Sequence, residues 1–169
     1  MKALVYTKYG PPDVLELKEV EKPTPQDDEV LIRVHAASVN ARDWHLLTAD
    51  IFLVRLMGGG LRKPKDTILG ADIAGQVETV GRNVTQFQPG DEVFGCRSGG
   101  FAEYVCARES ALALSPANLS FEEAAAVPIA AVTALQGLRD KGQIRPGQKV
   151  LINGASGGVG AFAVQVASA

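Results

Sequence analysis

The segment Lys149-Val150-Leu151-Ile152-Asn153-Gly154-Ala155-Ser156-Gly157-Gly158-Val159-Gly160 decides how the C-terminal part of the chain folds. Residues 149–153 are almost continuously apolar, which predicts a strand buried on both faces in a parallel sheet. A glycine-rich turn follows, and residues 161–167 are then apolar nearly all round, which predicts a buried helix. A strand, a glycine-rich turn and a helix in this order open a βαβ unit.

The turn itself has the residues that a dinucleotide needs. Gly157 and Gly160 match the last two glycines of the dinucleotide fingerprint, and Ala155 stands where the first is usually found. Gly157 lets backbone N–H groups approach a pyrophosphate, and Gly160 permits close packing of helix on strand. The alternative is an ordinary turn. The candidate cofactor-binding residues of the turn are Ala155, Ser156, Gly157, Gly158, Val159 and Gly160.

The first two thirds of the chain have the pattern of a β-sheet. Short segments with a period near two are separated by turns, and they predict strands at residues 14–20, 29–39, 72–80, 91–95 and 101–107. Residues 88–91 and 145–148 each place Pro and Gly where a tight turn requires them. Tight connections between short strands favour a small closed or nearly closed barrel.

Three helices are predicted between and after these strands. Asn40 can cap a helix at residues 41–47, and Ser120 with Glu123 forms a capping box ahead of residues 124–127. Pro128 ends or kinks that helix, and a further helix at residues 130–141 stops at Gly142. We therefore expect a catalytic domain at residues 1–120, connecting helices at 121–145 and the start of a cofactor-binding domain at 146–169.

The strand and helix expected at residues 149–167 have no neighbours of their own kind in this sequence. A lone strand and helix of this type would present an exposed apolar edge. We therefore expect the chain to be part of a longer polypeptide with a truncated cofactor domain. Residues 150–169 carry no charge, but their clustered glycines end one element and begin another, so we do not expect a membrane span.

Composition excludes several classes of protein. The 169 residues include 17 basic and 19 acidic side chains, for a net charge of −2, and no run of like charges suggests nucleic-acid binding. The basic residues at 55–65 are interrupted by Gly58, Gly59 and Gly60, which predicts a mobile loop. Two cysteines are too few for a disulfide scaffold. The N-terminal residues reach Lys8 before an apolar region of signal-peptide length accumulates, so we expect no signal peptide. A cytoplasmic location is the default expectation.

A series of spaced motifs gives the chain a specific family resemblance. The stretch Gly70-Ala71-Asp72-Ile73-Ala74-Gly75-Gln76-Val77 and the residues at 80–81, 87–95, 100–104, 125–128 and 133–134 precede the glycine-rich turn in order. Together they resemble the GroES-like catalytic domain and the first part of the Rossmann domain of the medium-chain dehydrogenase/reductase superfamily, in its zinc-independent quinone oxidoreductase branch. The resemblance implies a mixed β and α/β fold, in which a GroES-like β-barrel precedes the first strand and helix of a Rossmann dinucleotide-binding domain.

The zinc ligands of the superfamily's alcohol dehydrogenases are missing from the matching positions. Those positions hold Asn40 and Ala71, and no cysteine follows Cys106. Asp72 stands in place of the Glu of the zinc enzymes' signature, but a single carboxylate is not a zinc site, because catalytic zinc takes three protein ligands. The four-cysteine structural lobe is also absent. We therefore expect no metal.

By resemblance, Asn40 and Thr133 lie near the nicotinamide end of the cofactor, and Asp43 and Trp44 share the first segment. These are the candidate catalytic residues: Asn40, Asp43, Trp44 and Thr133. Trp44 provides an apolar wall for a flat substrate or is a core residue. His45 donates a proton near neutral pH or simply faces solvent, and the second reading is preferred.

Two different functions are compatible with the sequence. The first is an enzyme that transfers hydride from NADPH, or from NADH, to a quinone, an enone or a similar conjugated carbonyl, with an enoyl-thioester reductase as the close rival. The second is a non-catalytic GroES-like fragment. The expected partner is a small electrophilic substrate, with no nucleic acid and no membrane, and a homodimer would form through the absent part of the cofactor domain. The resemblance alone favours NADPH, because the residue that selects the cofactor lies about 20 positions past the fingerprint.

Overall fold

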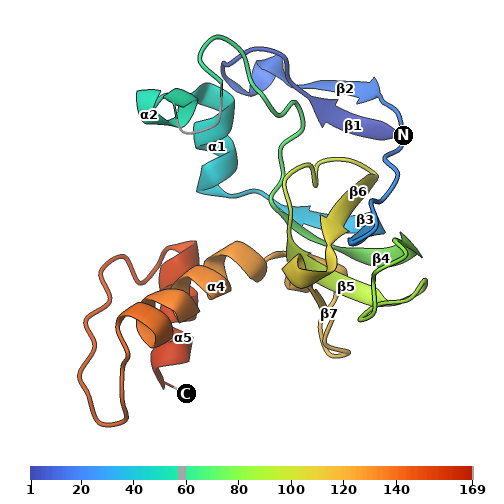
Figure 1. Cartoon of the computed structure of the whole chain (residues 1–169). Coiled ribbons are helices and arrows are strands. Elements are labelled where there is room, and N and C mark those ends of the chain that lie inside the picture. The colour runs from blue at the N-terminus through green and yellow to red at the C-terminus, as the bar shows by residue number, and fades with distance from the viewer. Residues whose placement is uncertain (57–59, 169) are drawn as a thin grey trace. The chain divides into compact units, whose positions relative to one another are not determined.

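The computed structural model describes residues 1–56 and 60–168. The chain divides into two compact units, Met1–Ala125 and Ala126–Ala169. In the first unit, five antiparallel strands form a sheet in the order β6-β3-β4-β5-β7 (Figure 1). Their bounds are β3 Glu29–Ser38, β4 Asp72–Val80, β5 Glu92–Cys96, β6 Tyr104–Arg108 and β7 Leu112–Leu114. A second sheet pairs β1 (Lys2–Val5) with β2 (Glu16–Glu19).

Two isolated bridges join β1 to segments outside the named strands and help to complete the predicted, nearly closed barrel. Ala3 pairs with Ala102, and Val5 pairs with Ile68. The β3–β4 ladder shifts register at two places, and such irregularities bend strands and increase their twist. At Gly75 of β4, an added Cβ would lie 2.1 Å from the Arg33 carbonyl oxygen, so only glycine allows β3 to approach this closely.

The barrel is filled by apolar side chains that alternate along its strands. The buried cluster consists of Val30, Ile32, Ile73, Val77, Phe87, Val93, Val105 and Ala107. Burial of each large side chain of this kind contributes about 1.5–3 kcal/mol to folding. This core anchors β3 and β4, whose ends lead into the candidate site.

Among the described residues of the first unit, short helices lie between the strands: η1 (Pro12–Val14), α1 (Ala41–Thr48), α2 (Phe52–Val54) and η3 (Glu109–Ala111). A last helix, α3 (Phe121–Ala125), buries Ala124 and Ala125 against Ala74 of the sheet. The predicted capping box at its start is confirmed, because Ser120 and Glu123 exchange hydrogen bonds of 2.8 and 3.2 Å. Since α3 packs on the sheet, the first unit extends past the boundary expected at residue 120.

Most strand predictions are confirmed, with differences at the ends. The strands expected at residues 29–39 and 72–80 agree with β3 and β4 within one residue. The strand expected at 14–20 is too long, because Pro12 starts a short 3₁₀ turn that includes Val14. The strand expected at 101–107 begins only at Tyr104. β1 and β7 were not predicted from the sequence, and both are held by pairing with distant residues.

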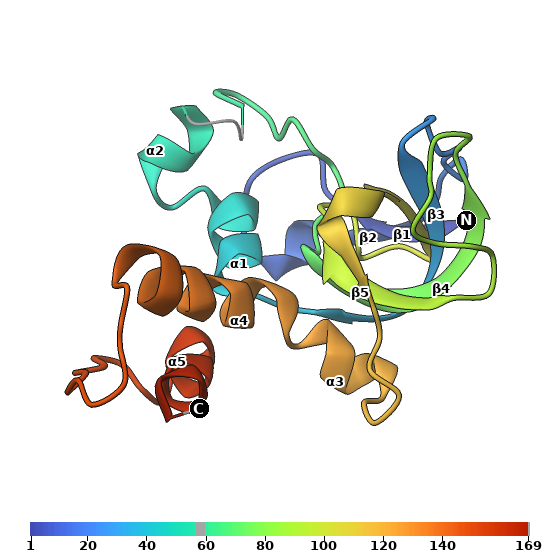
Figure 2. The same ribbon diagram turned by 60° about the horizontal axis from the view of Figure 1, so that its bottom comes forward.

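The second unit consists of helices and turns. α4 (Pro128–Leu135) continues into η4, a π-helix at Gln136–Lys141, and α5 (Gly158–Ser168) packs beside α4 (Figure 2). The helix predicted at 130–141 is confirmed, although it starts at Pro128, whose fixed φ suits a first helical turn. None of the helices among the described residues has the length and apolar character needed to cross a membrane.

The strand predicted at residues 149–153 is wrong. This segment forms no ladder with any described residue, and Leu151 is 95% exposed. A strand depends on hydrogen bonds to a neighbour, and the described part of the second unit supplies none. Residues 57–59 of the loop expected at 55–65 lie outside the described residues.

Candidate active site

Asn40 occupies the predicted N-cap position of α1, directly after β3. Its backbone is extended, with φ of −115° and ψ of 159°, and its N–H donates to Asp43 Oδ2 over 2.9 Å. Asp43 lies in the first turn of the helix, where a carboxylate is favoured by the helix dipole. The turn from strand to helix is therefore fixed by Asn40 and Asp43 together.

Asp43 also ties α1 to the segment before β4. The backbone N–H of Gly70 donates to Asp43 Oδ1 over 3.1 Å, and only 3% of Asp43 is exposed. Both carboxylate oxygens therefore accept hydrogen bonds from the backbone. This geometry gives Asp43 the contacts of a positioning residue, because its oxygens face the protein.

A second polar cluster holds the side chain of Asn40. Asn40 Nδ2 donates to Ser38 Oγ over 3.2 Å and to Asp72 Oδ2 over 3.1 Å, and Ser38 Oγ donates to the same Asp72 oxygen over 3.3 Å. Ser38 and Asp72 are partners in the β3–β4 ladder, and Asp72 is 1% exposed. A buried carboxylate with several donors orients each of them, so the amide nitrogen of Asn40 points toward Asp72.

The two positions that the zinc enzymes use for ligands therefore have other roles here. Asn40 hydrogen bonds to Ser38 and Asp72, and Ala71 is a buried methyl side chain. Among residues 1–56 and 60–168, no group of three or more His, Cys, Asp or Glu side chains is placed to hold a metal ion.

A pocket of about 510 Å³ lies beside α1 in the first unit. Its apolar walls come from Leu46, Ile51, Leu53, Val54, Ile68 and Leu69. Its polar lining consists of Tyr6, Arg42, Asp66 and Ser98. Arg42 Nη2 donates to Ser98 Oγ over 3.0 Å, and burial raises the pKa of the Tyr6 phenol to about 12. Pockets of this size and mainly apolar character suit small organic ligands.

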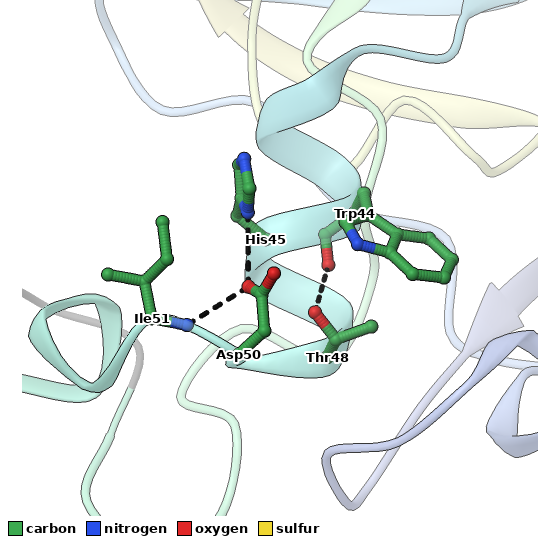
Figure 3. A network of polar contacts seen from close by, with 5 residues as sticks. All are labelled: Trp44, His45, Thr48, Asp50 and Ile51. Carbon is green, nitrogen blue, oxygen red and sulfur yellow. Dashed lines mark hydrogen bonds and ion pairs between the residues drawn. The ribbon is translucent and has the colours of Figure 1, made fainter.

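Polar contacts at the C-terminal end of α1 hold Ile51, which lines the pocket. Figure 3 shows these contacts. Asp50 Oδ1 lies 3.0 Å from His45 Nδ1 and accepts a hydrogen bond from the Ile51 N–H, also over 3.0 Å. The hydrogen bond with His45 holds the pKa of the Asp50 carboxyl below its ordinary value. Ala49, between them, has a positive φ of 46°, which ends the helix and turns the chain toward Ile51.

Trp44 and His45 point in different directions from α1 (Figure 3). Trp44 is 49% exposed, so it is not a core residue. The backbone carbonyl of Trp44 accepts a hydrogen bond from Thr48 Oγ1 over 2.8 Å. His45 is partly exposed and engaged with Asp50. The structure thus brings Asn40, Asp43 and Trp44 together at the first half of α1, while Thr133 belongs to α4 of the second unit.

The glycine-rich turn of the second unit is tight. Gly154 has a φ of 74°, and the Gly157 N–H donates to its carbonyl oxygen over 3.0 Å. A Cβ on Gly160 would lie 2.2 Å from that same oxygen, so the tight turn requires glycine there. A Cβ on Gly157 would meet only ordinary contacts, and Gly158 faces open space. The N–H groups of the first turn of α5 have no partner within the helix, so these residues fit a pyrophosphate.

Comparison with known proteins shows the family to which the chain belongs. Residues 26–117 match the family described as alcohol dehydrogenase GroES-like domain. The chain is 38% identical to the quinone oxidoreductase of Sus scrofa over 172 residues. The alignment covers 100% of this chain and 50% of that protein. The chain belongs to the quinone oxidoreductase branch of the medium-chain dehydrogenase/reductase superfamily. The resemblance inferred from residues 70–134 is thus confirmed.

Other members of the superfamily are similar to the same extent. A 2-methylene-furan-3-one reductase of Solanum lycopersicum is 39% identical over 180 residues, covering 99% of this chain and 44% of that one. The crystal structure of the CurK enoyl reductase superposes with a TM-score of 0.91 at 33% identity, covering 99% of this chain and 51% of that chain. The chain spans about half the length of the curated relatives that it matches.

The polar lining of the pocket was not predicted from the sequence. Tyr6, Arg42 and Asp66 stand in no recognisable motif, and their separations along the chain follow no helical or strand period. They meet because β1 bridges to Ile68 through Val5, a pairing of distant residues. Only the family resemblance, which drew attention to the segment after Asn40, pointed toward this region.

Proposed function

We propose that the protein is an NAD(P)H-dependent oxidoreductase that works without zinc and transfers hydride to a quinone, an enone or a similar conjugated carbonyl. The observation that carries the proposal is the Asn40 side chain, held by Ser38 and Asp72 at a position where the zinc enzymes have a ligand. An amide fixed in this way can position a cofactor or substrate by hydrogen bonding.

Zinc-independent chemistry is supported by the types of residue present. Asn40 donates its amide hydrogens to neighbouring oxygens, and Ala71 offers no lone pair. Zinc prefers cysteine sulfur and histidine nitrogen, so these two positions do not fit that metal. No step of the mechanism that we propose therefore involves zinc.

The chain's own residues would bind and orient the reactants. The turn at Gly154–Gly160 would hold the pyrophosphate of a dinucleotide, with Gly157 leaving room for it and the first turn of α5 supplying N–H donors. When bound, the reduced nicotinamide supplies the hydride. Asp43 keeps α1 in place through Asn40 and Gly70, and Trp44 offers an exposed flat apolar surface. We propose NADPH as the preferred cofactor and the cytoplasm as the location of the protein.

Enoyl-thioester reduction is the second candidate. It is favoured by the structural similarity to the CurK enoyl reductase, which superposes with a TM-score of 0.91. Reduction of an enone and reduction of an enoyl thioester both add hydride to a carbon–carbon double bond conjugated to a carbonyl, so one scaffold can serve both.

The proposal is tested by titrating the purified protein with NADPH while nicotinamide fluorescence is followed, and then by adding substrates. We expect saturable binding and oxidation of NADPH in the presence of 1,4-naphthoquinone or an aliphatic enone. Turnover of crotonyl-coenzyme A without turnover of the quinone would favour the second candidate. Absence of NADPH and NADH binding would leave the non-catalytic GroES-like reading.

A further inference from the structure

The pocket beside α1 has two hydrogen-bond donors that the fold does not use fully. Tyr6 follows β1, and its position is rigid: its N–H donates to the Thr67 carbonyl over 2.9 Å, and its ring packs with Leu47 and Leu69. Only 3% of Tyr6 is exposed. A side chain held this firmly presents its hydroxyl in one place.

The Tyr6 hydroxyl forms no hydrogen bond with any residue in the described ranges. In the described part of the chain, Arg55 Nε is the one side-chain nitrogen or oxygen that is fully buried without a hydrogen-bond partner. Since the Tyr6 hydroxyl also lacks such a partner, its oxygen is not fully buried. The phenol oxygen is therefore open to the pocket that Tyr6 lines. A nearly buried polar group without a protein partner is a place where a ligand or water completes the hydrogen bonding.

Arg42 is the second donor. It stands one turn before Leu46 on α1, donates one hydrogen bond to Ser98 Oγ and forms no ion pair with any residue that the structure describes. A guanidinium group has five N–H donors, so others remain for a ligand. The phenol of Tyr6 stays protonated at neutral pH, because burial raises its pKa to about 12.

The charges of the pocket suit an uncharged ligand. Arg42 brings one positive charge and Asp66 one negative charge, so the lining is neutral overall. An anionic ligand would gain from Arg42 but meet Asp66, whereas a neutral carbonyl oxygen can accept hydrogen bonds without this repulsion. The six aliphatic side chains of the wall favour an apolar body attached to that oxygen.

We propose that Tyr6 and Arg42 bind the carbonyl oxygen of an uncharged conjugated ketone or quinone, whose apolar body fills the pocket beside α1. This inference rests on the proposed function and assigns the residues that bind its substrate. It makes Tyr6 and Arg42 binding residues that determine specificity, and it makes Ile51, held by Asp50, part of the wall against which the substrate packs.

The test is direct binding of benzylideneacetone, an uncharged enone, to the purified protein, followed by calorimetry or by ligand-observed NMR. Cinnamate has the same skeleton with a carboxylate in place of the ketone. The test variants are Tyr6→Phe, which keeps the buried ring, and Arg42→Met. The matched controls are Tyr104→Phe on β6 and Arg82→Met, neither of which lines this pocket. Thermal unfolding of each variant checks that it is folded.

We expect the affinity for benzylideneacetone to fall about three- to tenfold in Tyr6→Phe and at least as much in Arg42→Met, the loss that one hydrogen bond produces. The control variants should bind like the wild type, and cinnamate should bind more weakly than the ketone. Wild-type affinity in Tyr6→Phe and Arg42→Met, or tighter binding of cinnamate, would overturn the proposal.

A parallel assay separates this inference from the proposed function. The same variants are tested for oxidation of NADPH with benzylideneacetone as substrate. Binding that depends on Tyr6 without turnover means that the pocket assignment holds and the proposed activity fails. Turnover with a KM unchanged in both variants means that the activity holds and the pocket assignment fails.

Discussion

Gly70 shows how one residue can connect the barrel to the candidate site. Its N–H donates to Asp43, and its φ of 90° lies in the left-handed region that favours glycine. A Cβ on Gly70 would come within 2.5 Å of Phe101 Cδ1 and 2.6 Å of the Phe101 backbone nitrogen. Glycine is therefore required at position 70 by the backbone conformation and by the packing, and its N–H also makes the hydrogen bond to Asp43. The sequence placed it inside a family motif without indicating any of these reasons.

We expect Gly70→Ala to lower the free energy of unfolding by about 2–5 kcal/mol, since it adds a steric conflict to a strained φ. Gly90→Ala is the matched control, because Gly90 has a similar φ of 98° but nothing within 4 Å of an added Cβ. It should cost only about 1–2 kcal/mol. Urea unfolding measures both. Equal losses in the two variants would mean that Phe101 moves aside at no cost.

At the scale of elements, a small hydrogen-bonded turn at the end of α1 positions part of the pocket wall. His45 comes from the helix, Asp50 from the following turn, and Ile51 continues into α2. The sequence predicted α1 and its N-cap from local signals. It did not predict the pairing of His45 with Asp50, because Ala49 at a positive φ gave no sign of a helix end there.

The titration of Asp50 tests this pairing. Because the pKa of Asp50 in the folded protein lies below the ordinary 3.8, the pair stabilises the fold at pH values above 3.8, and this contribution is lost as the pH falls through the lowered pKa. Replacing His45 by Gln removes the largest cause of the shift, so the pKa of Asp50 should rise toward 3.8. NMR of the carboxyl carbon follows it.

The matched control for that titration is His35→Gln, because His35 stacks on Phe121, 4.4 Å between ring centroids, and does not contact Asp50. An unchanged pKa of Asp50 in His45→Gln would contradict the assignment and point instead to Thr48 and the Ile51 N–H. Both groups of the pair are substantially exposed, so little change in thermal stability accompanies the shift.

At the scale of the whole molecule, local chemistry was predictable and long-range pairing was not. The capping box at Ser120 and the Pro–Gly turn at residues 88–91 were expected from a few adjacent residues, and both are confirmed. The strand expected at 149–153 depends on a neighbour that the apolar pattern cannot supply. The pocket lining likewise depends on the bridge from Val5 to Ile68. Family resemblance supplied the candidate site where periodicity could not.

The glycine-rich turn of the second unit gives a prediction that separates folding from cofactor binding. Gly160→Ala places a Cβ 2.2 Å from the Gly154 carbonyl oxygen, so it should destabilise the turn and lower NADPH affinity together. Gly157→Ala meets only a 3.4 Å contact in the free protein, so its stability should remain close to that of the wild type. The added methyl group nevertheless occupies the space through which the backbone approaches a pyrophosphate.

We therefore expect Gly157→Ala to weaken NADPH binding about three- to tenfold, equivalent to the loss of one backbone hydrogen bond, at an unchanged melting temperature. Gly137→Ala in η4 is the matched control, since an added Cβ there meets nothing within 4 Å and lies outside the turn. Fluorescence titration with NADPH and thermal unfolding are measured on the same samples. If the phosphates bind at this turn, the methyl group of Gly157→Ala must obstruct them. Wild-type NADPH affinity in Gly157→Ala would therefore show that the turn does not contact the phosphates.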